Sequence, residues 1–386
     1  MSKSNSRPLY SLEKAPTFQN KVYESAEAAR QAPVGSLNIV WDSTTGCYAN
    51  ADFSEARMQY DTDYDNSVPS QIFLDYYDSI ADHLVEQYRL SDSLILDIGC
   101  GKGTFITRMI KRHSSLRAQG IDPSYEGDLS TLEGKVRFVC EPFSPKLVSS
   151  EERPALVTCR HTLEHVSPVD FIRGIGNAFR AHDMYDIALF VEVPDLDWIL
   201  DNNAFWDFCY EHVNYFDRST LRSCLEKGGC HTQSISEAFS SQYLWAEAIL
   251  NPSTDSKLLA DTNPDPSTVE RASQMRMNLQ LAIERMREIA SQRHIVIWGM
   301  ATKGVMYCIH MMHAGVEVKK CVDINQRKHG RFAPVSAQEI CPPEDLDPDN
   351  PYAIVCMNPN YMEEIRAQCR DMGLNVAFFD PDGTAL

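Results

Sequence analysis

A glycine-rich turn after a short apolar run is the first feature whose residue types could do chemistry. The run Leu94–Ile98 leads into Gly99, Gly101 and Gly103, which gives the spacing Gly-x-Gly-x-Gly. Glycines at these places let the backbone approach a bound molecule closely. A dinucleotide fingerprint has the spacing Gly-x-Gly-x-x-Gly and holds a pyrophosphate, which the carboxylate of Asp97 beside this loop would repel. The turn therefore favours a zwitterionic cofactor that carries an amino acid.

A second acidic residue, Asp122, follows at the end of the next expected strand. A carboxylate at this place accepts hydrogen bonds from both hydroxyls of a ribose. Glu141 comes after the third expected strand, where it would lie near the edge of a purine. The glycine turn after Asp97 could also be an ordinary strand-to-helix turn with no ligand. The position of Asp122 at the end of the second strand favours cofactor binding over that alternative.

Polar residues follow the next expected strand, Ala155–Cys159. The carboxyl ends of strands in a doubly wound sheet border the ligand crevice, so we expect Arg160 and His161 to contact the cofactor. His165 lies one helical turn beyond His161 and would face the same cleft, although a role in knitting loops together explains it equally well. A zinc or iron site with Glu164 is conceivable, but the His-x-x-x-His pair lacks a convincing third ligand.

A second glycine loop occurs in the C-terminal part of the chain. The apolar run Ile295–Trp298 leads into Gly299, Lys303 and Gly304, ahead of a helix-like segment. Lys303 and Gly304 are placed to meet a phosphate at the start of that helix, such as the diphosphate of a substrate. A vestigial nucleotide fold in which Lys303 merely caps the helix is an equal alternative.

The elements that must position these residues alternate between strands and helices. An amphipathic helix is expected from Ser70 to about Leu90, and a capped long helix over residues 267–289. Strands separated by helix-length segments indicate a parallel sheet covered on both faces. The expected strands are Leu94–Ile98, a strand ending at Gly120–Asp122, Val136–Cys140, Ala155–Cys159, Ile187–Val193, Ile295–Trp298, Val316–Asp323 and Tyr352–Met357.

We therefore predict an α/β protein with a doubly wound Rossmann-like core and a second, smaller Rossmann-like domain at its C-terminus. A shift to Asn, Pro, Asp, Ser and Thr around Asn251–Pro266 indicates a domain boundary. The first sixty or so residues show no sustained period and are expected to be irregular. The predicted divisions are an N-terminal arm or cap (1–69), a cofactor-binding core (70–250), a linker with a long helix (251–293) and a C-terminal substrate domain (294–386).

Several motifs that occur in order give the chain a specific family resemblance. Leu94–Gly103 and Gly120–Asp122 resemble the class I S-adenosylmethionine-dependent methyltransferases. With the motifs that follow them, the chain resembles the sugar C-methyltransferase family from about Tyr60 to the C-terminus. The resemblance implies S-adenosylmethionine as cofactor and methylation of a nucleotide-linked deoxysugar on the carbon next to its ketone. The further motifs are Arg160–His165, Glu192–Pro194, Tyr210–Phe216, Gln242–Leu244 and Gly299–Gly304.

The same resemblance implies a catalytic pair, Glu211 and His212. A base must remove a proton α to the carbonyl, and the enolate must be stabilised before it attacks the sulfonium methyl. His212 would be the base, Glu211 would orient it or bind a sugar hydroxyl, and Tyr215 would donate to the enolate oxygen. His161 is a further catalytic candidate. Tyr64 would close over the substrate, with packing inside a cap as the alternative.

Two departures from the family pattern bear on metal content and on the acceptor. Many members carry an N-terminal zinc module with two cysteine pairs, but Cys47 stands alone in this segment, so we expect no structural zinc and no other metal. Cys209 occupies the place where members have a tyrosine two residues before the glutamate of the pair. An O- or N-methyltransferase of another small secondary metabolite is therefore the alternative to sugar C-methylation.

Composition argues against several classes of protein. The 386 residues carry a formal charge of −18, and so acidic a surface repels nucleic-acid phosphates and anionic lipid. The cysteines are scattered without a Cys-x-x-Cys pair, as is usual in a reducing cytosol, and no signal peptide or membrane-spanning run is recognisable. We expect a cytoplasmic monomer or homodimer that acts on a small molecule and contacts neither nucleic acid nor a membrane.

Two classes remain as rivals to a methyltransferase. An NAD-dependent oxidoreductase would use the loop at Gly299, which lacks the three-glycine dinucleotide spacing. A non-enzymatic binding protein would use both loops to hold ligands. Measured methyl transfer would dispose of the second rival.

Overall fold

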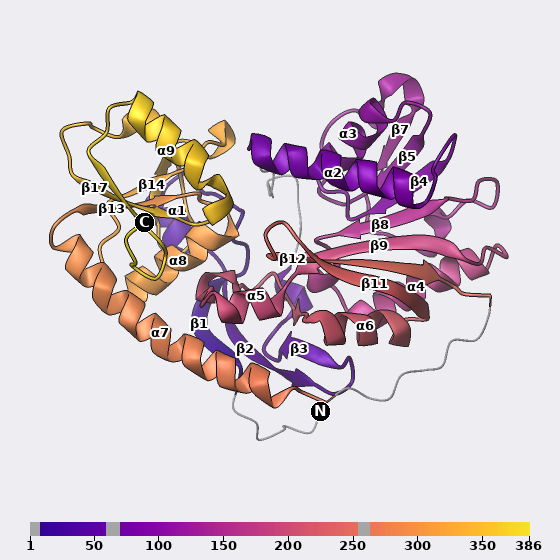
Figure 1. The fold of residues 1–386 in the computed structure, drawn as a ribbon, viewed down its shortest axis with the longest axis horizontal. Helices are drawn as coiled ribbons and strands as arrows, with labels where there is room; N and C mark the ends of the chain where they lie inside the picture. The colour runs from indigo at the N-terminus through magenta and orange to yellow at the C-terminus, as the bar shows by residue number, and fades with distance from the viewer. Residues whose placement is uncertain (1–7, 59–69, 254–262) are drawn as a thin grey trace.

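The computed structural model describes residues 8–58, 70–253 and 263–386. Two α/β units are joined by an antiparallel sheet from the N-terminal segment, and Figure 1 shows the C-terminal unit beside the larger one. The long helix α7 (Pro266–Ala290) leads from the N-terminal strands to the C-terminal unit, close to the helix expected over 267–289. No helix in this described part of the chain is both long enough and apolar enough to cross a lipid bilayer.

The larger unit is built on an eight-stranded sheet whose five inner strands are parallel. Its strands are β4 (Leu94–Ile98), β5 (Arg117–Ile121), β6 (Ser130–Thr131), β7 (Val136–Val139), β8 (Leu156–Arg160), β9 (Ile187–Pro194), β11 (Cys230–Ala238) and β12 (Tyr243–Leu250). They lie in the order β11-β12-β9-β8-β4-β5-β7-β6, and β9 to β7 pair in parallel. The expected parallel strands are therefore present, with antiparallel strands added at both edges.

Helices cover both faces of this sheet. Successive side chains of a strand point to opposite faces, and both faces of these strands carry apolar side chains. Ile95 on β4 belongs to the apolar cluster that includes residues of α2 (Gln71–Gln87) and α3 (Thr104–Arg112). The next residue, Leu96, belongs to the cluster with α4 (Pro168–Arg180) and α6 (Arg218–Lys227). The predicted doubly wound Rossmann-like core is confirmed.

The C-terminal unit is a second, smaller sheet of the same kind, in the order β15-β16-β14-β13-β17-β18. Its elements are β13 (His294–Trp298), α8 (Thr302–His313), β14 (Lys320–Val322), β15 (Arg331–Phe332), β16 (Glu339–Cys341), β17 (Tyr352–Cys356), α9 (Met362–Asp371) and β18 (Val376–Phe379). All neighbours except β15 and β16 pair in parallel. The strand expected over Val316–Asp323 is shorter than predicted, since β13 offers it three paired positions.

The N-terminal segment differs from the irregular arm that the sequence suggested. It contains β1 (Tyr10–Pro16), α1 (Ala26–Arg30), β2 (Val34–Asp42) and β3 (Cys47–Asn50), and the larger unit adds β10 (Asn214–Tyr215) to this antiparallel sheet. Leu37 and Ile39 are buried on one face of β2 while Asn38 between them is half-buried. So short an alternation gives little signal in the sequence, because its partners are supplied by distant elements. The pairing of β10 with β3 holds Asn214 and Tyr215 of the larger unit against the N-terminal sheet.

A buried histidine connects this N-terminal sheet to the C-terminal unit. The hydroxyl of Tyr10 on β1 lies 2.7 Å from Nε2 of His310 on α8, and Tyr10 also stacks on Phe208. Burial, reinforced by the nearby His313, lowers the pKa of His310 to about 3. Its imidazole is therefore neutral in the folded protein, where Nε2 shares a hydrogen bond with the hydroxyl of Tyr10.

We expect His310 to make the fold sensitive to acid. Between about pH 6.5 and pH 3 the unfolded chain binds a proton that the folded chain does not, so stability falls as the pH is lowered, by up to about 1.4 kcal/mol per pH unit. Denaturant unfolding at pH 7 and pH 5 should show a difference that is smaller in His310→Gln by about 2 kcal/mol. The exposed His231→Gln is the matched control. Equal pH differences in all three proteins would contradict this expectation.

Candidate active site

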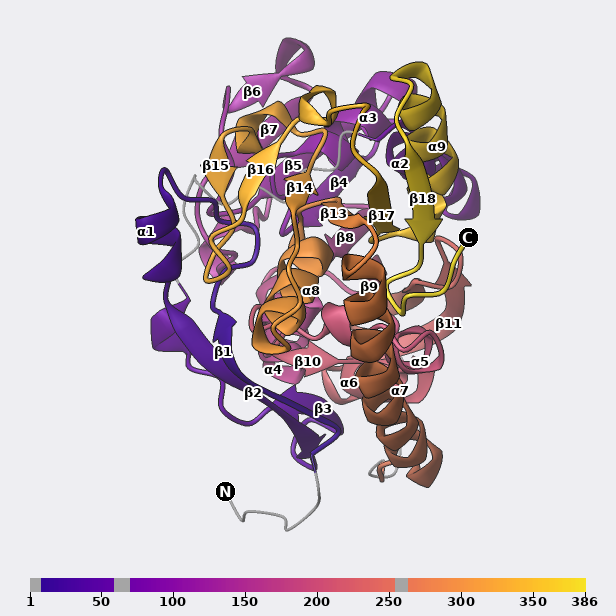
Figure 2. The ribbon, with the colours of Figure 1, turned by 90° about the vertical axis from the view of Figure 1, so that its left-hand side faces the viewer.

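A cavity of about 1930 Å³ lies between the two α/β units. Its wall includes Gly99 and Gly101 of the first loop, Gly299 and Lys303 of the second, and Asn50 of β3. Figure 2 is viewed from the side of the C-terminal unit. The central strands of the larger unit lie behind the C-terminal unit in this view. The structure therefore brings the two glycine loops to one space, with the N-terminal sheet at its border.

The first loop can exist in this shape because it is made of glycine. Gly99 and Gly103 have φ of 79° and 74°, in the left-handed region that side chains disfavour. A Cβ on Gly99 would lie 2.0 Å from Oγ1 of Thr162, and one on Gly103 would lie 2.5 Å from the ring of Phe138. Gly103 itself lies behind the wall, where it begins α3. Glycine at both positions lets the backbone form this tight cradle, which a side chain would prevent by colliding with Thr162 or Phe138.

Two carboxylates border this cradle, as the sequence predicted. Oδ2 of Asp122 accepts the N–H of Gly101 at 2.9 Å, and Oδ1 accepts from Ser124, so the carboxylate is held across the loop. Asp97 is buried and accepts the hydroxyl of Thr158 at 2.7 Å. Burial raises the pKa of Asp97 to about 6. Both carboxylates line the cavity and fit a cofactor with an ammonium group and ribose hydroxyls.

Glu141 lies outside the cavity wall, where its carboxylate pairs with Nζ of Lys146 at 2.7 Å. Cys140 before it donates its thiol to the carbonyl of Tyr125, whereas Pro142 and Phe143 after it line the cavity. The place of this glutamate beside a purine therefore stays a prediction.

Arg160 lies at the end of β8 with its charge already compensated. Its Nε–H donates to Glu192 at 2.8 Å, and its guanidinium lies 4.4 Å from the ring centroids of both Tyr77 and Phe105. The side chain is buried between these groups while still reaching the cavity. Arg160 thus forms part of the wall and does not offer a free positive charge to the cofactor.

His161 is held between two carboxylates. Its Nδ1 lies 3.4 Å from Glu164 and its Nε2 lies 3.5 Å from Glu192, while its backbone N–H donates to the carbonyl of Glu192 at 2.8 Å. The residue has φ of 48°, a left-handed conformation that a non-glycine residue adopts at a cost. The ring lines the cavity, so the structure places His161 where a bound substrate could reach it.

Glu192 connects several residues of this wall, and no role for it follows from the sequence motif Glu192–Pro194. Its carboxylate accepts the hydroxyl of Tyr76 and lies 3.2 Å from Nε1 of Trp245, besides its contacts to Arg160 and His161. Burial opposes its ionisation, but Arg160 and His161 keep the pKa of its carboxyl below the ordinary value. An acidic residue inside the otherwise apolar run of β9 was the available signal.

Glu211 and Tyr215 are not placed as the catalytic roles require. The carboxylate of Glu211 accepts the backbone N–H of Gln19 and lies outside the cavity wall. The hydroxyl of Tyr215 donates to the carbonyl of Cys209 at 3.1 Å and accepts its N–H at 3.0 Å, inside the apolar core. Both residues hold neighbouring segments of the chain in place. The prediction that Tyr215 donates a hydrogen bond to the enolate oxygen is therefore wrong, and Glu211 is a positioning residue.

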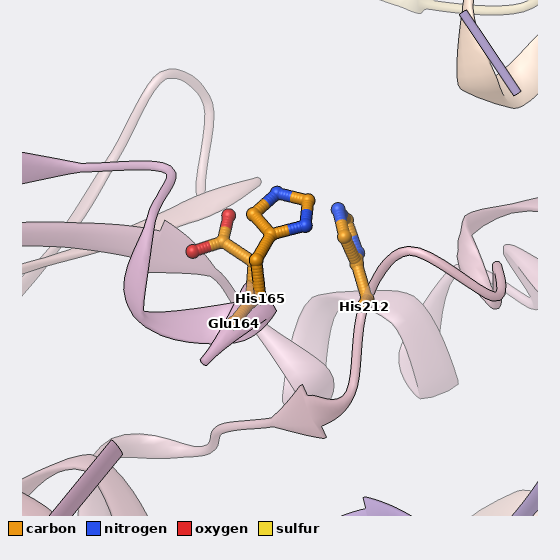
Figure 3. A group of neighbouring side chains, drawn as sticks. All are labelled: Glu164, His165 and His212. Carbon is orange, nitrogen blue, oxygen red and sulfur yellow. The ribbon is translucent and has the colours of Figure 1, made fainter. Parts of the chain in front are cut away.

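His212 does reach the cavity, where it lies beside Glu164 and His165, as Figure 3 shows. Burial, together with His165, lowers the pKa of His212 to about 3, so its imidazole is neutral. Burial opposes the charge of Glu164, but His161 and the other two imidazoles keep the pKa of its carboxyl below the ordinary value. Nδ1 of His165 donates to the carbonyl of Glu211 at 2.8 Å. No motif or spacing in the sequence indicated that His212 would lie beside Glu164 and His165.

The second loop offers less free charge than expected. Nζ of Lys303 donates to Asp207 at 2.9 Å and to Gln242 at 3.2 Å, although the side chain still lines the cavity. Gly304 lies outside the wall, where a Cβ would meet the carbonyl oxygen of Gly299 at 2.0 Å, so its role is close packing. Tyr64, expected to close over the substrate, lies outside the described residues.

Comparisons with known proteins agree with this arrangement. Residues 73–235 match the model of a methyltransferase domain, and residues 266–378 match that of a C-methyltransferase C-terminal domain. The C-methyltransferase NovU of Streptomyces niveus is 22% identical over 305 residues, which are 74% of this chain and 71% of the relative.

Solved structures of methyltransferases are similar to part of this chain. CalO1, a methyltransferase in calicheamicin biosynthesis, is 15% identical with a TM-score of 0.33, over 45% of this chain and 54% of that one. Magnesium protoporphyrin IX methyltransferase ChlM from Synechocystis PCC 6803 is 14% identical with a TM-score of 0.34, over 48% of this chain and 90% of that one. The chain thus spans about half the length of CalO1.

Fold, loop and domain matches together define the class: this chain is a class I S-adenosylmethionine-dependent methyltransferase that acts on a small molecule. Within that class it resembles the sugar C-methyltransferases, through its C-terminal domain and through NovU. S-adenosylmethionine is its cofactor, as the sequence indicated.

We expect Asp122→Asn to weaken binding of S-adenosylhomocysteine about 10- to 100-fold, since hydrogen bonds to a charged acceptor contribute about 1.5–3 kcal/mol. Titration calorimetry measures the change. Glu141→Gln is the matched control, because this carboxylate lies outside the cavity wall, and its affinity should equal that of the unmodified protein. A loss in Glu141→Gln as large as that in Asp122→Asn would contradict the placement of both.

Tyr215→Phe should lower the free energy of unfolding by about 1–3 kcal/mol, because it leaves buried backbone groups of Cys209 without their partner. Methyl transfer should stay close to its original rate, since the hydroxyl is directed into the core. Denaturant unfolding and turnover measured side by side check this. A folded variant whose turnover falls by about 100-fold or more would restore Tyr215 as a catalytic donor.

Proposed function

We propose that this methyltransferase adds a methyl group to the carbon next to a ketone in a nucleotide-linked deoxysugar, through an enolate. The support comes from the C-methyltransferase C-terminal domain, the similarity to NovU and the cavity that joins both glycine loops. The observation that carries the proposal is His161, an imidazole in the cavity wall between two carboxylates.

The first glycine loop would hold the cofactor. Asp122 would accept the ribose hydroxyls, and Asp97 would face the ammonium group of the methionine part. S-adenosylmethionine supplies an electrophilic methyl group when bound. The protein's own residues must therefore present the acceptor carbon to this side of the cavity and remove its proton.

We assign the base to His161 in place of the expected His212. A base gains positive charge as it takes a proton, and the carboxylates of Glu164 and Glu192 lie 3.4 and 3.5 Å from the two ring nitrogens of His161. His212 has no such pair of carboxylates, and desolvation together with His165 lowers its pKa to about 3. The proton would pass from the α-carbon of the acceptor to His161, and the electron pair left on the carbon would form the new bond to the methyl while the sulfonium S–CH3 bond breaks and leaves its electrons on sulfur.

The nucleotide part of the acceptor would lie along the second loop. Lys303 and Thr302 at the start of α8 line the cavity there, and Asn20 of the N-terminal segment donates to the hydroxyl of Thr302 at 3.0 Å. Asp207 compensates the charge of Lys303, so a bound diphosphate would share this lysine with the carboxylate. This arrangement supports an anionic group held by hydrogen bonds as well as by charge.

The test uses a panel of nucleotide-linked 4-keto-deoxysugars with methyl-labelled cofactor, followed by carbon NMR of the products. A new C-methyl signal is expected, and without the methyl donor, solvent deuterium should appear at the adjacent carbon. His161→Gln should reduce both by about 100-fold or more, the usual contribution of a general base. His231→Gln, an exposed histidine on β11, is the matched control.

Other outcomes would overturn parts of the proposal. Undiminished deuterium exchange in His161→Gln would remove this residue as the base and return the role to His212. No C-methyl product across the panel, with S-adenosylhomocysteine still bound tightly, would exclude these acceptors. Label recovered on oxygen or nitrogen from metabolite extracts would then establish the O- or N-methyltransferase alternative.

A further inference from the structure

We propose that Glu164, His165 and His212 bind one divalent transition-metal ion at the cavity, with zinc as the reference ion. All three side chains line the cavity, and their ligand atoms lie within 4.8 Å of one another. Figure 3 shows the two imidazoles facing each other with the carboxylate beside them. Glu164 and His165 come from the turn after β8, and His212 comes from the segment before β10, so the fold supplies the third ligand that the sequence lacked.

The donor set fits such an ion. Two imidazoles and one carboxylate are the ligands of many catalytic zinc sites and of non-haem iron sites, which keep positions open for another ligand. Zinc-to-ligand distances of about 2.0–2.2 Å require the three atoms to move closer together than 4.8 Å when the ion binds. The side facing the cavity is left for the acceptor.

A second observation is the carboxylate of Glu164, whose side chain is 1% exposed. Within the part of the chain that the structure describes, neither of its oxygens has a hydrogen-bond partner. Nδ1 of His161 lies 3.4 Å away, outside hydrogen-bond geometry. A buried carboxylate that accepts no hydrogen bond is costly even with the imidazole of His161 3.4 Å away, and a cation between it and the two imidazoles would lower that cost.

A third observation is the orientation of His165. A carbonyl oxygen only accepts, so the contact between Nδ1 of His165 and the carbonyl of Glu211 places the proton on Nδ1 and leaves a lone pair on Nε2. Metal-binding histidines are commonly held in this way by a second hydrogen bond. Glu211, whose carboxylate in turn holds the backbone of Gln19, acquires a physical role here as the residue that orients a ligand.

The metal would stabilise the enolate, a role that rests on the proposed function. The hydroxyl of Tyr215, the predicted hydrogen-bond donor to the enolate oxygen, is directed into the core. The enolate oxygen therefore needs another group that stabilises its negative charge. With the ketone oxygen on the open side of the metal, the α-proton passes to His161, and the negative charge develops on the oxygen. No electrons enter or leave the metal, so a redox-inert ion is sufficient.

The first measurement is metal binding by the full-length protein without an affinity tag. Chelator-treated protein titrated with Co²⁺ should develop visible ligand-field bands that saturate near one ion per chain, and Zn²⁺ should displace it. Glu164→Gln and His212→Gln should bind Co²⁺ about 100-fold more weakly or not at all. His161→Gln, which changes the proposed base and no ligand, and the exposed His231→Gln should saturate as the unmodified protein does.

Controls separate the metal site from folding and from the proposed function. Retained binding of S-adenosylhomocysteine shows that a variant is folded, and all four variants must pass this check. Absence of a saturable Co²⁺ spectrum, or an equal spectrum in Glu164→Gln and His212→Gln, would overturn the site. Deuterium exchange at full rate in metal-free protein would overturn the enolate role. One bound metal with no exchange in any ketone would leave the site standing while the proposed function fails.

Discussion

The carboxylate of Glu192 lies inside the central sheet with none of its side chain exposed to water, and such a charge is stable only where donors surround it. The donors come from three directions: the guanidinium of Arg160 on β8, the hydroxyl of Tyr76 on α2, and the indole N–H of Trp245 on β12. Because each donor is drawn to one point, the helix, the parallel strand and the antiparallel strand are held in register. His161 follows from the same constraint, since its backbone and its ring both contact this glutamate.

In both glycine loops a backbone N–H binds a carboxylate at the end of the next strand, but the charged groups around the two loops differ. In the first, the N–H of Gly101 binds Asp122 at the end of the next strand, and in the second the N–H of Met300 binds Asp323 in the same place. The second carboxylate has the buried ammonium of Lys328 3.6 Å away, whereas the first loop has a further carboxylate, Asp97, beside it. The first loop thus has two carboxylates beside it, whereas in the second loop a lysine compensates the carboxylate. The fold is repeated, but the charge around each loop is not.

The sequence predicted most of the fold because parallel strands are nearly continuous apolar runs. Leu94–Ile98 coincides with β4, and the glycine loop, Asp97 and Asp122 lie at the cavity as expected. It could not predict what depends on contacts between distant segments. The hydroxyl of Tyr215 would serve chemistry or structure equally well until its partner is known, and that partner is a backbone group six residues away. Glu141 is a similar case, since Pro142 and Phe143 after it line the cavity while its own carboxylate pairs with Lys146.

β10 contributes two residues to a sheet whose other strands all lie within the first fifty residues of the chain. During synthesis the free edge of β3 therefore emerges well over a hundred residues before its partner, and Tyr10 waits still longer for His310. An unpaired edge is open to association with other chains until it is covered. The N-terminal sheet is thus the first part of the molecule to be made, while the edge of β3 stays unpaired until β10 has been synthesised. Slow elongation between these two strands would prolong that exposure.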